Sequence, residues 1–243
     1  MTSDRTVTHW DRVYTSREIV PAPPDDPVLG WALDHFGDVR GRRLLDLGCG
    51  AGEHTLAFAA LGADVTAVDT SEISIEKLRR FCRDNRVSNV DAIRSPAQAI
   101  GRLGSFELAF GSFILHHIEP FHEFAATLAS VLPSGGRAFF YENSAAVGAP
   151  ALWFRQNLAG RFGFPKYGDS DEFPLTKDEI GELRRYFRVR VEQPTLFLFK
   201  LLSMYVLRGA VFSRAFDQLD RTLYRFPSIR GLSYRQCLYL ERA

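Results

Sequence analysis

The sequence has few cysteines, almost no net charge and no secretion signal. Its 3 cysteines, Cys49, Cys82 and Cys237, lie far apart without a C-x-x-C pair, so neither a disulfide framework nor a thiolate zinc site is expected. We expect reduced thiols and a cytoplasmic location, since the N-terminus also lacks an apolar signal core. The net charge of +1 disfavours nucleic acid as a partner.

A long apolar segment is lacking as well. The most apolar stretch, residues 196–212, contains Lys200 and Arg208 and is shorter than the ~20 residues that a spanning helix needs. No transmembrane segment is therefore expected. Basic residues interleaved in this part of the chain leave peripheral contact with a membrane surface as one hypothesis and ordinary solvated faces as another.

What the sequence does contain is a regular alternation of apolar runs and amphipathic segments from residue 42 onward. The runs predict strands at 42–49, 64–71, 89–96, 105–115, 136–143 and 188–199, and the amphipathic segments predict helices at 53–62, 72–85, 120–132 and 176–187. A last run, 232–242, predicts an antiparallel strand at the edge of the sheet. The fold class is thus α/β, a doubly wound, seven-stranded, mostly parallel, Rossmann-like sheet with an aromatic-rich helical cap.

The whole chain, 1–243, is expected to be a single domain. Within it we expect an N-terminal cap segment at 1–41, a ligand-binding core at 42–142, and cap insertions at 144–175 and 200–230. Aromatic residues recur in the two insertions, among them Trp153, Phe162, Tyr205, Phe216 and Tyr224. They predict a bulky hydrophobic small molecule as the ligand of the cap, with a cap core or a homodimer interface as alternatives.

A glycine-rich turn follows the first strand, in the stretch LLDLGCGAG at 44–52. A strand, a glycine turn and a helix start form a nucleotide site, because the ligand can approach the backbone. The dinucleotide pattern G-x-G-x-x-G is broken by Glu53, which would repel a phosphate, so a nicotinamide oxidoreductase is disfavoured. A bare strand-to-helix turn without a ligand is the alternative.

Two acids accompany the turn. Asp46 precedes it and suits a cationic ligand, and Asp69 ends the second strand about twenty residues on, where an acid accepts both hydroxyls of a ribose. The ligand should therefore be a nucleoside with free ribose hydroxyls, no phosphate and a positive tail. S-adenosylmethionine fits this description. As the alternative, Asp69 alone would be a helix cap.

LLDLGCGAGEHT together with VTAVDTS resembles the class I S-adenosylmethionine-dependent methyltransferase family over about residues 42–142. The resemblance implies that Asp46, Gly48, Cys49, Gly50 and Gly52 surround the methionine part of the cofactor. It further implies that Asp69 and Thr70 lie at the ribose, Ala97 or Gln98 at the adenine, Phe110 at the transfer channel, and Tyr14 with Trp10 over the site. Pro96 stands where relatives often have an acid that contacts the adenine.

Histidines and acids gather in LHHIEPFHEF at 115–124. His116 or His117, with a slight preference for His117, is a candidate general base, because each follows the end of a strand. Glu142, at the end of the fifth strand, is a third catalytic candidate. A metal site is not expected, since the spacing is not that of a ligand motif, and purely structural roles are the alternative for all three.

The expected function is methyl transfer to a hydrophobic natural product, lipid or glycolipid, most simply at oxygen. Alternatives are a cyclase or isomerase that retains the cofactor, and a non-catalytic binding protein. An intact glycine turn disfavours the last of these. Since the sulfonium is already activated, alignment alone can supply much of the rate.

Overall fold

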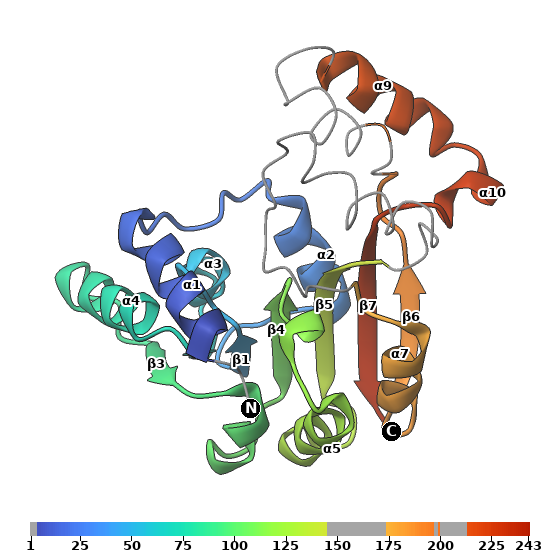
Figure 1. Cartoon of the computed structure of the whole chain (residues 1–243). Coiled ribbons are helices and arrows are strands. Elements are labelled where there is room, and N and C mark those ends of the chain that lie inside the picture. Colours follow the sequence, from blue (N-terminus) through green and yellow to red (C-terminus); the bar gives the residue numbers. More distant parts are fainter. Residues whose placement is uncertain (1–3, 145–173, 197–198, 200–212) are drawn as a thin grey trace. The chain divides into compact units, whose positions relative to one another are not determined.

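The computed structural model describes residues 4–144, 174–196, 199 and 213–243 (Figure 1). Most of the two expected cap insertions, 145–173 and 200–212, lies outside these described residues. The chain divides into two compact units. The first contains Met1–Tyr141, Asp178–Arg190 and Leu238–Ala243, and the second contains Glu142–Lys177 and Val191–Cys237. The single domain and the cap expected from the sequence stay predictions.

Seven strands form one sheet in the order β3-β2-β1-β4-β5-β7-β6. The first five are β1 (Arg43–Leu47), β2 (Asp64–Asp69), β3 (Val90–Arg94), β4 (Leu108–Ser112) and β5 (Arg137–Asn143), and their pairings are parallel. The last two are β6 (Phe187–Glu192) and β7 (Arg235–Arg242). This confirms the predicted α/β sheet and places the carboxyl ends of β1, β2 and β4 along one edge.

The prediction that the last strand lies at the edge is wrong. Strand β7 runs antiparallel to β5, since Gly135 and Arg242 bond at one end of the pair and Ser144 and Tyr234 at the other. It lies inside the sheet between β5 and β6. Burial explains this order, because five consecutive residues of β7, from Gln236 to Leu240, are buried, whereas alternate residues of β6 are exposed. Exposed charged side chains suit an edge strand.

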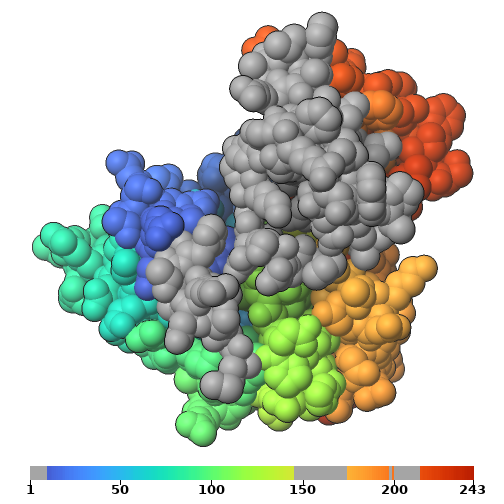
Figure 2. Space-filling model, viewed as in Figure 1, coloured from blue at the N-terminus to red at the C-terminus, as the bar shows by residue number. Residues whose placement is uncertain are grey.

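Helices cover the sheet. They are α3 (Glu53–Ala60), α4 (Glu72–Asp84), α5 (Phe121–Val131) and α7 (Lys177–Arg184), with short 3₁₀ turns η1 (Ala97–Arg102) and η2 (Leu115–His117). Figure 1 shows α5 on the near face and α2 (Pro27–Phe36) and α3 on the far face, and Figure 2 shows the outer surface of α5 exposed. The core between them includes the fully buried Phe58, Phe110, Phe124, Phe139 and Phe140.

The N-terminal segment contains two helices that the sequence analysis did not predict. Helix α1 (Asp4–Ser16) packs on α4, and α2 begins at Pro27 after the N-cap Asp26, whose carboxylate accepts from Leu29 N at 2.8 Å. In the second unit, α9 (Ser213–Leu223) and α10 (Pro227–Arg230) lie within the cap insertion expected at 200–230. No helix within the described stretches has both the length and the apolarity to cross a membrane.

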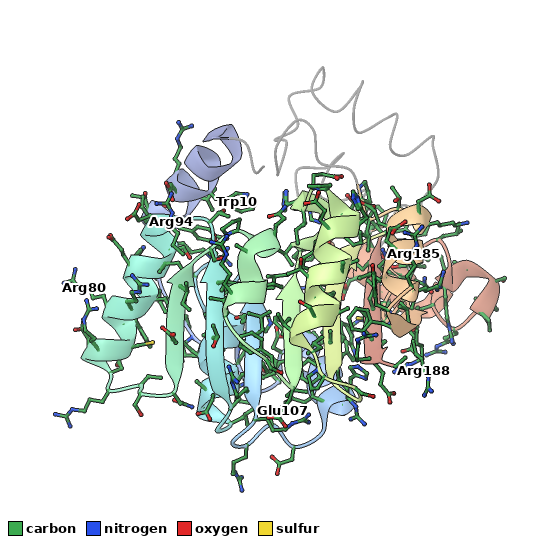
Figure 3. The ribbon with its side chains drawn as sticks, turned by 90° about the horizontal axis from the view of Figure 1, so that it is seen from below. Trp10, Arg80, Arg94, Glu107, Arg185 and Arg188 are labelled. Atoms are coloured by element: carbon green, nitrogen blue, oxygen red, sulfur yellow. The ribbon has the colours of Figure 1, made fainter. Side chains whose placement is uncertain are left out.

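Figure 3 shows the side of the sheet on which the parallel strands end and the side on which they start. Trp10 of α1 lies near the carboxyl ends of the strands, and Glu107, just before β4, lies at the opposite side, where the strands start. At that opposite side Glu107 accepts from Arg42 Nε and from Arg43 N, both at 3.2 Å, which ties the starts of β1 and β4 together. The side near Trp10 is the one that carries the cavity described next.

Candidate active site

The glycine turn between β1 and α3 is held by the end of β2. Val68 O accepts from Gly48 N at 2.8 Å and from Cys49 N at 3.0 Å. Asp69 Oδ2 accepts from Gly50 N at 2.9 Å. Gly50 has a φ of +52°, and a Cβ there would lie 2.6 Å from the Tyr14 hydroxyl, so a side chain is excluded by conformation and by space. The turn is therefore shaped before a ligand arrives.

Asp69 lines a cavity at the end of β2. Besides Gly50 N, its carboxylate accepts from Ser71 N at 2.9 Å through Oδ1. Burial raises the pKa of Asp69, while these backbone hydrogen bonds act in the opposite direction. Each carboxylate oxygen has two lone pairs, so both oxygens retain capacity for a ligand hydroxyl.

Asp46 lies behind the turn. It is 2% exposed, and its Oδ2 accepts from the Thr55 hydroxyl at 2.5 Å. Burial raises its pKa to about 6, against the lowering effect of the Thr55 hydrogen bond and of His54. It is not among the residues that line the cavity. Its predicted contact with the methionine part of a cofactor stays a prediction.

Helix α1 contributes Trp10 and Tyr14 to the wall of the cavity. Their rings stack with centroids 5.7 Å apart. Burial, followed by the negative charge of Asp69, raises the pKa of Tyr14, which therefore keeps its phenol proton. The end of α1 is anchored by Lys77 of α4, whose Nζ donates to the carbonyls of Tyr14 (2.8 Å), Thr15 (3.2 Å) and Arg17 (2.6 Å).

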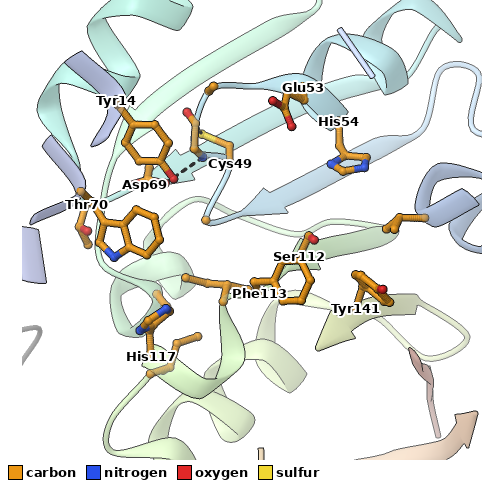
Figure 4. A pocket seen from close by; sticks show the side chains of 18 of the residues that line it. Tyr14, Cys49, Glu53, His54, Asp69, Thr70, Ser112, Phe113, His117 and Tyr141 are labelled. Carbon is orange, nitrogen blue, oxygen red and sulfur yellow. Dashed lines mark hydrogen bonds between the residues drawn. The ribbon is translucent and has the colours of Figure 1, made fainter. Parts of the chain in front are cut away.

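The cavity has a volume of about 390 Å³ and runs along the carboxyl edge of the sheet. One part of the lining consists of Asp69 and Thr70 at the end of β2, Ala97 and Gln98 of η1, and His117 of η2. Another part consists of Asp26, His54, Ser112, Phe113 and Tyr141. Figure 4 shows His117 on the side of Tyr14 and Thr70, and His54 on the side of Ser112 and Tyr141. Ser112 and Tyr141 are register partners on β4 and β5.

Ten residues that the sequence analysis assigned to the site line this cavity. They are Trp10, Tyr14, Gly48, Cys49, Gly50, Asp69, Thr70, Ala97, Gln98 and His117. Their roles stay predictions. Cys49 has its pKa raised, first by burial and then by the nearby acids, so its thiol is protonated.

The remaining predicted residues do not line it. Gly52 and Phe110 are buried beneath it, and the His116 ring packs on His117 with centroids 4.1 Å apart. Glu142 is fully buried and belongs to the second unit. Among the residues that the structure describes, no group of three His, Cys, Asp or Glu side chains is placed to hold a metal ion.

Sequence reasoning missed His54 and Asp26. The His54 Nε2 atom lies 3.4 Å from Asp26 Oδ1, and the His54 ring packs on Phe110 with centroids 4.8 Å apart. Asp26 and His54 are 28 residues apart in the sequence, and only the fold brings them together. The one local signal was Asp26 followed by Pro27, which is typical of a helix start and says nothing about a partner histidine.

Comparison with known proteins gives a match to the family model described as methyltransferase domain, over residues 44–136. A ubiquinone biosynthesis O-methyltransferase of Aromatoleum aromaticum is 31% identical over 134 residues, which is 54% of this chain and 55% of that protein. The chain thus covers about half the length of the curated relatives that it matches.

Solved structures are similar over almost the whole chain. The geranyl diphosphate C-methyltransferase of Streptomyces coelicolor superposes with a TM-score of 0.63 at 15% identity, covering 100% of each chain. The cyclase SpnF superposes with a TM-score of 0.62 at 14% identity, covering 98% of this chain and 92% of that one. At such identities the likeness shows the fold alone.

The sheet, the glycine turn and the acid at the end of β2 define a Rossmann-like nucleoside-binding core. Residues 44–136, which contain that turn and that acid, form a methyltransferase domain. The match to that domain and the similarity to the O-methyltransferases agree with the resemblance of residues 42–142 to the class I S-adenosylmethionine-dependent methyltransferase family.

Proposed function

We propose that the chain binds S-adenosylmethionine and catalyses transfer of its methyl group to a hydroxyl of a hydrophobic small molecule. The observation that carries the cofactor assignment is the Asp69 carboxylate, held by Gly50 N and Ser71 N at the wall of a cavity of about 390 Å³. A buried carboxylate fixed in this way suits the paired hydroxyls of a ribose. Ligand pockets of this kind are typically 300–1,000 Å³.

The residues present fit the rest of the cofactor as well. Glycines allow close approach to the backbone of the turn. Ala97 and Gln98 also line the cavity, on η1 after β3, the strand next to β2, which supports their assignment to the adenine. When bound, the cofactor supplies an electrophilic methyl group on sulfur. The chain's own contribution is to align the acceptor and exclude water, which alone can account for much of the acceleration.

Oxygen is proposed as the acceptor atom because the curated relatives are named as O-methyltransferases of ubiquinone biosynthesis. The apolar and aromatic lining at the β4–β5 end of the cavity, with Val28, Phe113 and Tyr141, suits a hydroxylated ring. The relatives' names favour a quinone precursor over the natural product and glycolipid first expected. A homodimer, peripheral membrane contact and a cytoplasmic location stay predictions.

Calorimetric titration of S-adenosylmethionine and S-adenosylhomocysteine tests the cofactor site. We expect binding to the wild type, and binding weaker by ~100-fold or more in Asp69→Ala, because two hydrogen bonds to a charged group are each worth about 1.5–3 kcal/mol. Asp64→Asn is the matched control, since Asp64 is an exposed acid at the start of the same strand. Absence of binding to the wild type would remove the basis of the proposal.

Incubation with S-adenosylmethionine and 4-hexylcatechol, an alkylated dihydroxybenzene, tests the reaction. We expect a product heavier by one methylene group. An unchanged mass with a rearranged product would instead indicate a cyclase or isomerase. No product, with cofactor binding intact, would contradict the proposed acceptor class and leave the cofactor assignment standing.

A further inference from the structure

We propose that His54 is the general base that takes the proton from the acceptor hydroxyl, and that Asp26 is the positioning residue that orients its imidazole. The proposal rests on the proposed function, because it assigns a role in that reaction. It differs from the sequence-based candidate, His117, which follows β4 through η2.

The His54 imidazole is fixed on two sides. Its Nε2 faces Asp26 Oδ1 at 3.4 Å, and its ring lies on Phe110, which is itself in contact with Phe58 and Phe139. The side chains of His54 and Asp26 are 17% and 25% exposed, so the pair is largely shielded while both residues line the cavity. A partly buried pair of this kind keeps a defined geometry.

Asp26 is fixed independently of His54. Its Oδ1 accepts from Leu29 N at 2.8 Å as the N-cap of α2. The loop that carries it is tied to the start of α3 by the hydrogen bond from Ala22 N to Glu53 O at 2.8 Å. The carboxylate is therefore held against the residue that follows Glu53, which is His54.

The contact with Asp26 selects the tautomer of His54. A carboxylate accepts only from a protonated nitrogen, so in the neutral imidazole Nε2 carries the proton and Nδ1 carries the lone pair. Across the residues that the structure describes, Nδ1 of His54 makes no hydrogen bond. It is the nitrogen available to a ligand in the cavity. The histidine–carboxylate pairs of hydrolases follow the same logic with the two nitrogens exchanged, since there the carboxylate binds Nδ1–H and Nε2 is the base.

The order of residues along the cavity favours His54 over His117. Asp69 places the ribose at the end of β2, and the glycine turn of β1 leads from there toward β4 and β5. His54 lies at that β4–β5 end, because it packs on Phe110 of β4, two residues before Ser112 on the same face of the strand. His117 contacts Trp10, with ring centroids 5.8 Å apart, on the side of Thr70 in Figure 4.

The step balances as follows. The acceptor O–H bond breaks and its proton passes to Nδ1 of His54, while the acceptor oxygen forms its bond to the methyl carbon. The bond from that carbon to the positive sulfur breaks, and the sulfur keeps the electron pair as a neutral thioether. Asp26 stabilises the imidazolium that results, and the proton then leaves to solvent.

The first experiment reads the tautomer and needs no acceptor. In ¹⁵N NMR of the histidine side chains at neutral pH, we expect His54 to show a protonated Nε2 and an unprotonated Nδ1. In Asp26→Asn this preference should weaken, while α2 remains capped, because Asn is as good an N-cap as Asp. A dominant Nδ1–H tautomer in the wild type would overturn the proposal.

The second experiment compares His54→Gln, Asp26→Asn and His117→Gln in the catechol assay. A general base contributes about 10²–10⁴ in rate, so we expect kcat to fall ~100-fold in His54→Gln and less in Asp26→Asn. Calorimetric affinity for S-adenosylhomocysteine should stay within ~3-fold of wild type. His122→Gln, on the exposed side of α5, is the matched control.

Other groups near His54 titrate or carry charge and must be separated from it. They are Asp26 before α2, Asp46 on β1, Glu53 with its partner Arg17, and Tyr141 on β5. Asp46 has a pKa of about 6, in the range in which imidazoles titrate. The rise of kcat with pH should therefore disappear in His54→Gln and persist in Asp46→Asn.

Three results would overturn the proposal. The first is a kcat in His54→Gln within ~3-fold of wild type. The second is a loss of kcat with its pH dependence in His117→Gln instead. The third is an unchanged kcat with cofactor affinity weakened ~10-fold or more in His54→Gln, which would make His54 a cofactor-binding residue. Failure of the wild type to bind cofactor or methylate the catechol would count against the proposed function. The tautomer measurement needs neither cofactor nor acceptor, so it tests the His54–Asp26 pair separately.

Discussion

Asp46 should cost the folded protein stability at neutral pH, and Asp46→Asn should remove that cost. The carboxylate is buried, and the Thr55 hydroxyl at 2.5 Å is the hydrogen-bond donor that acts to lower its pKa. Its pKa nevertheless rises from 3.8 to about 6. The amide has nearly the same shape and can accept the same hydrogen bond without bringing a charge into the interior.

The magnitude follows from the difference between the folded and unfolded pKa of Asp46. In the folded state the pKa is the higher one, so the protonated group favours folding at low pH, and this contribution is lost as the pH rises from about 4 to about 6. About 2 pKa units at about 1.4 kcal/mol each give a cost of about 3 kcal/mol at pH 7. In Asp46→Asn the hydrogen bond from Thr55 to the neutral amide is weaker, which reduces the expected gain in stability by about 1 kcal/mol.

Thermal unfolding between pH 4.5 and 8 measures the effect. A gain of about 2 kcal/mol predicts a Tm about 4–8 °C above wild type at pH 7, with little difference at pH 4.5. The exposed Asp64→Asn should show neither change. A Tm that falls at pH 7, or a pH dependence that survives the substitution, would refute the reasoning. If the charge also holds the cofactor's amino group, the more stable variant should bind S-adenosylmethionine less tightly.

Two further changes test the turn and helix α1. Gly52→Ala should destabilise the fold by about 2 kcal/mol or more in urea unfolding, because φ is +79° and the new Cβ would lie 2.6 Å from Leu78 Cδ1. The control Gly135→Ala has a similar φ of +77° but open space around the new Cβ, so its free energy of unfolding should fall by only about 1 kcal/mol. Lys77→Met should speed hydrogen exchange in α1 by ~10-fold, because Nζ no longer binds the carbonyls at the end of that helix. The control Arg80→Met, on the exposed side of α4, should leave exchange in α1 unchanged. Equal losses in the two glycine variants, or unchanged exchange in Lys77→Met, would contradict these assignments.

The sequence was sufficient for the part of the fold that rests on local signals. Five apolar runs predicted β1 to β5, and the helix predicted at 72–85 is α4, whose N-cap Ser71 accepts from Ser74 N at 3.1 Å. The glycines and Asp69 predicted residues that do line the cavity, because their spacing is fixed by one strand–turn–helix–strand unit, β1–α3–β2. Helices α1 and α2 were missed, although Val7, Trp10 and Tyr14 recur at helical spacing and Asp26 before Pro27 is a start signal.

The rest depended on contacts between distant segments. Strand β7 lies between β5 and β6, which bury it on both sides. No pattern within 232–242 specifies these two neighbours. The contact between Asp26 and His54 requires the loop before α2 to lie on the start of α3, which the hydrogen bond from Ala22 to Glu53 achieves. His117 was favoured because position after a strand end is visible in a sequence, whereas direction along the cavity is not.

The two backbone hydrogen bonds to Asp69 bear on how sharply the chain can tell one nucleoside from another. If the ligand supplied the only hydrogen bonds to a buried carboxylate, an analogue lacking a hydroxyl would leave that carboxylate unpaired. Discrimination against the analogue would then be severe. Here Gly50 N and Ser71 N already bond to the carboxylate at 2.9 Å each. A deoxyribose analogue therefore loses only the net value of one hydrogen bond to a charged group, about 1.5–3 kcal/mol, or roughly a 10- to 150-fold preference. Under the proposed function, we therefore expect Asp69 to select a ribose in a graded way and not absolutely.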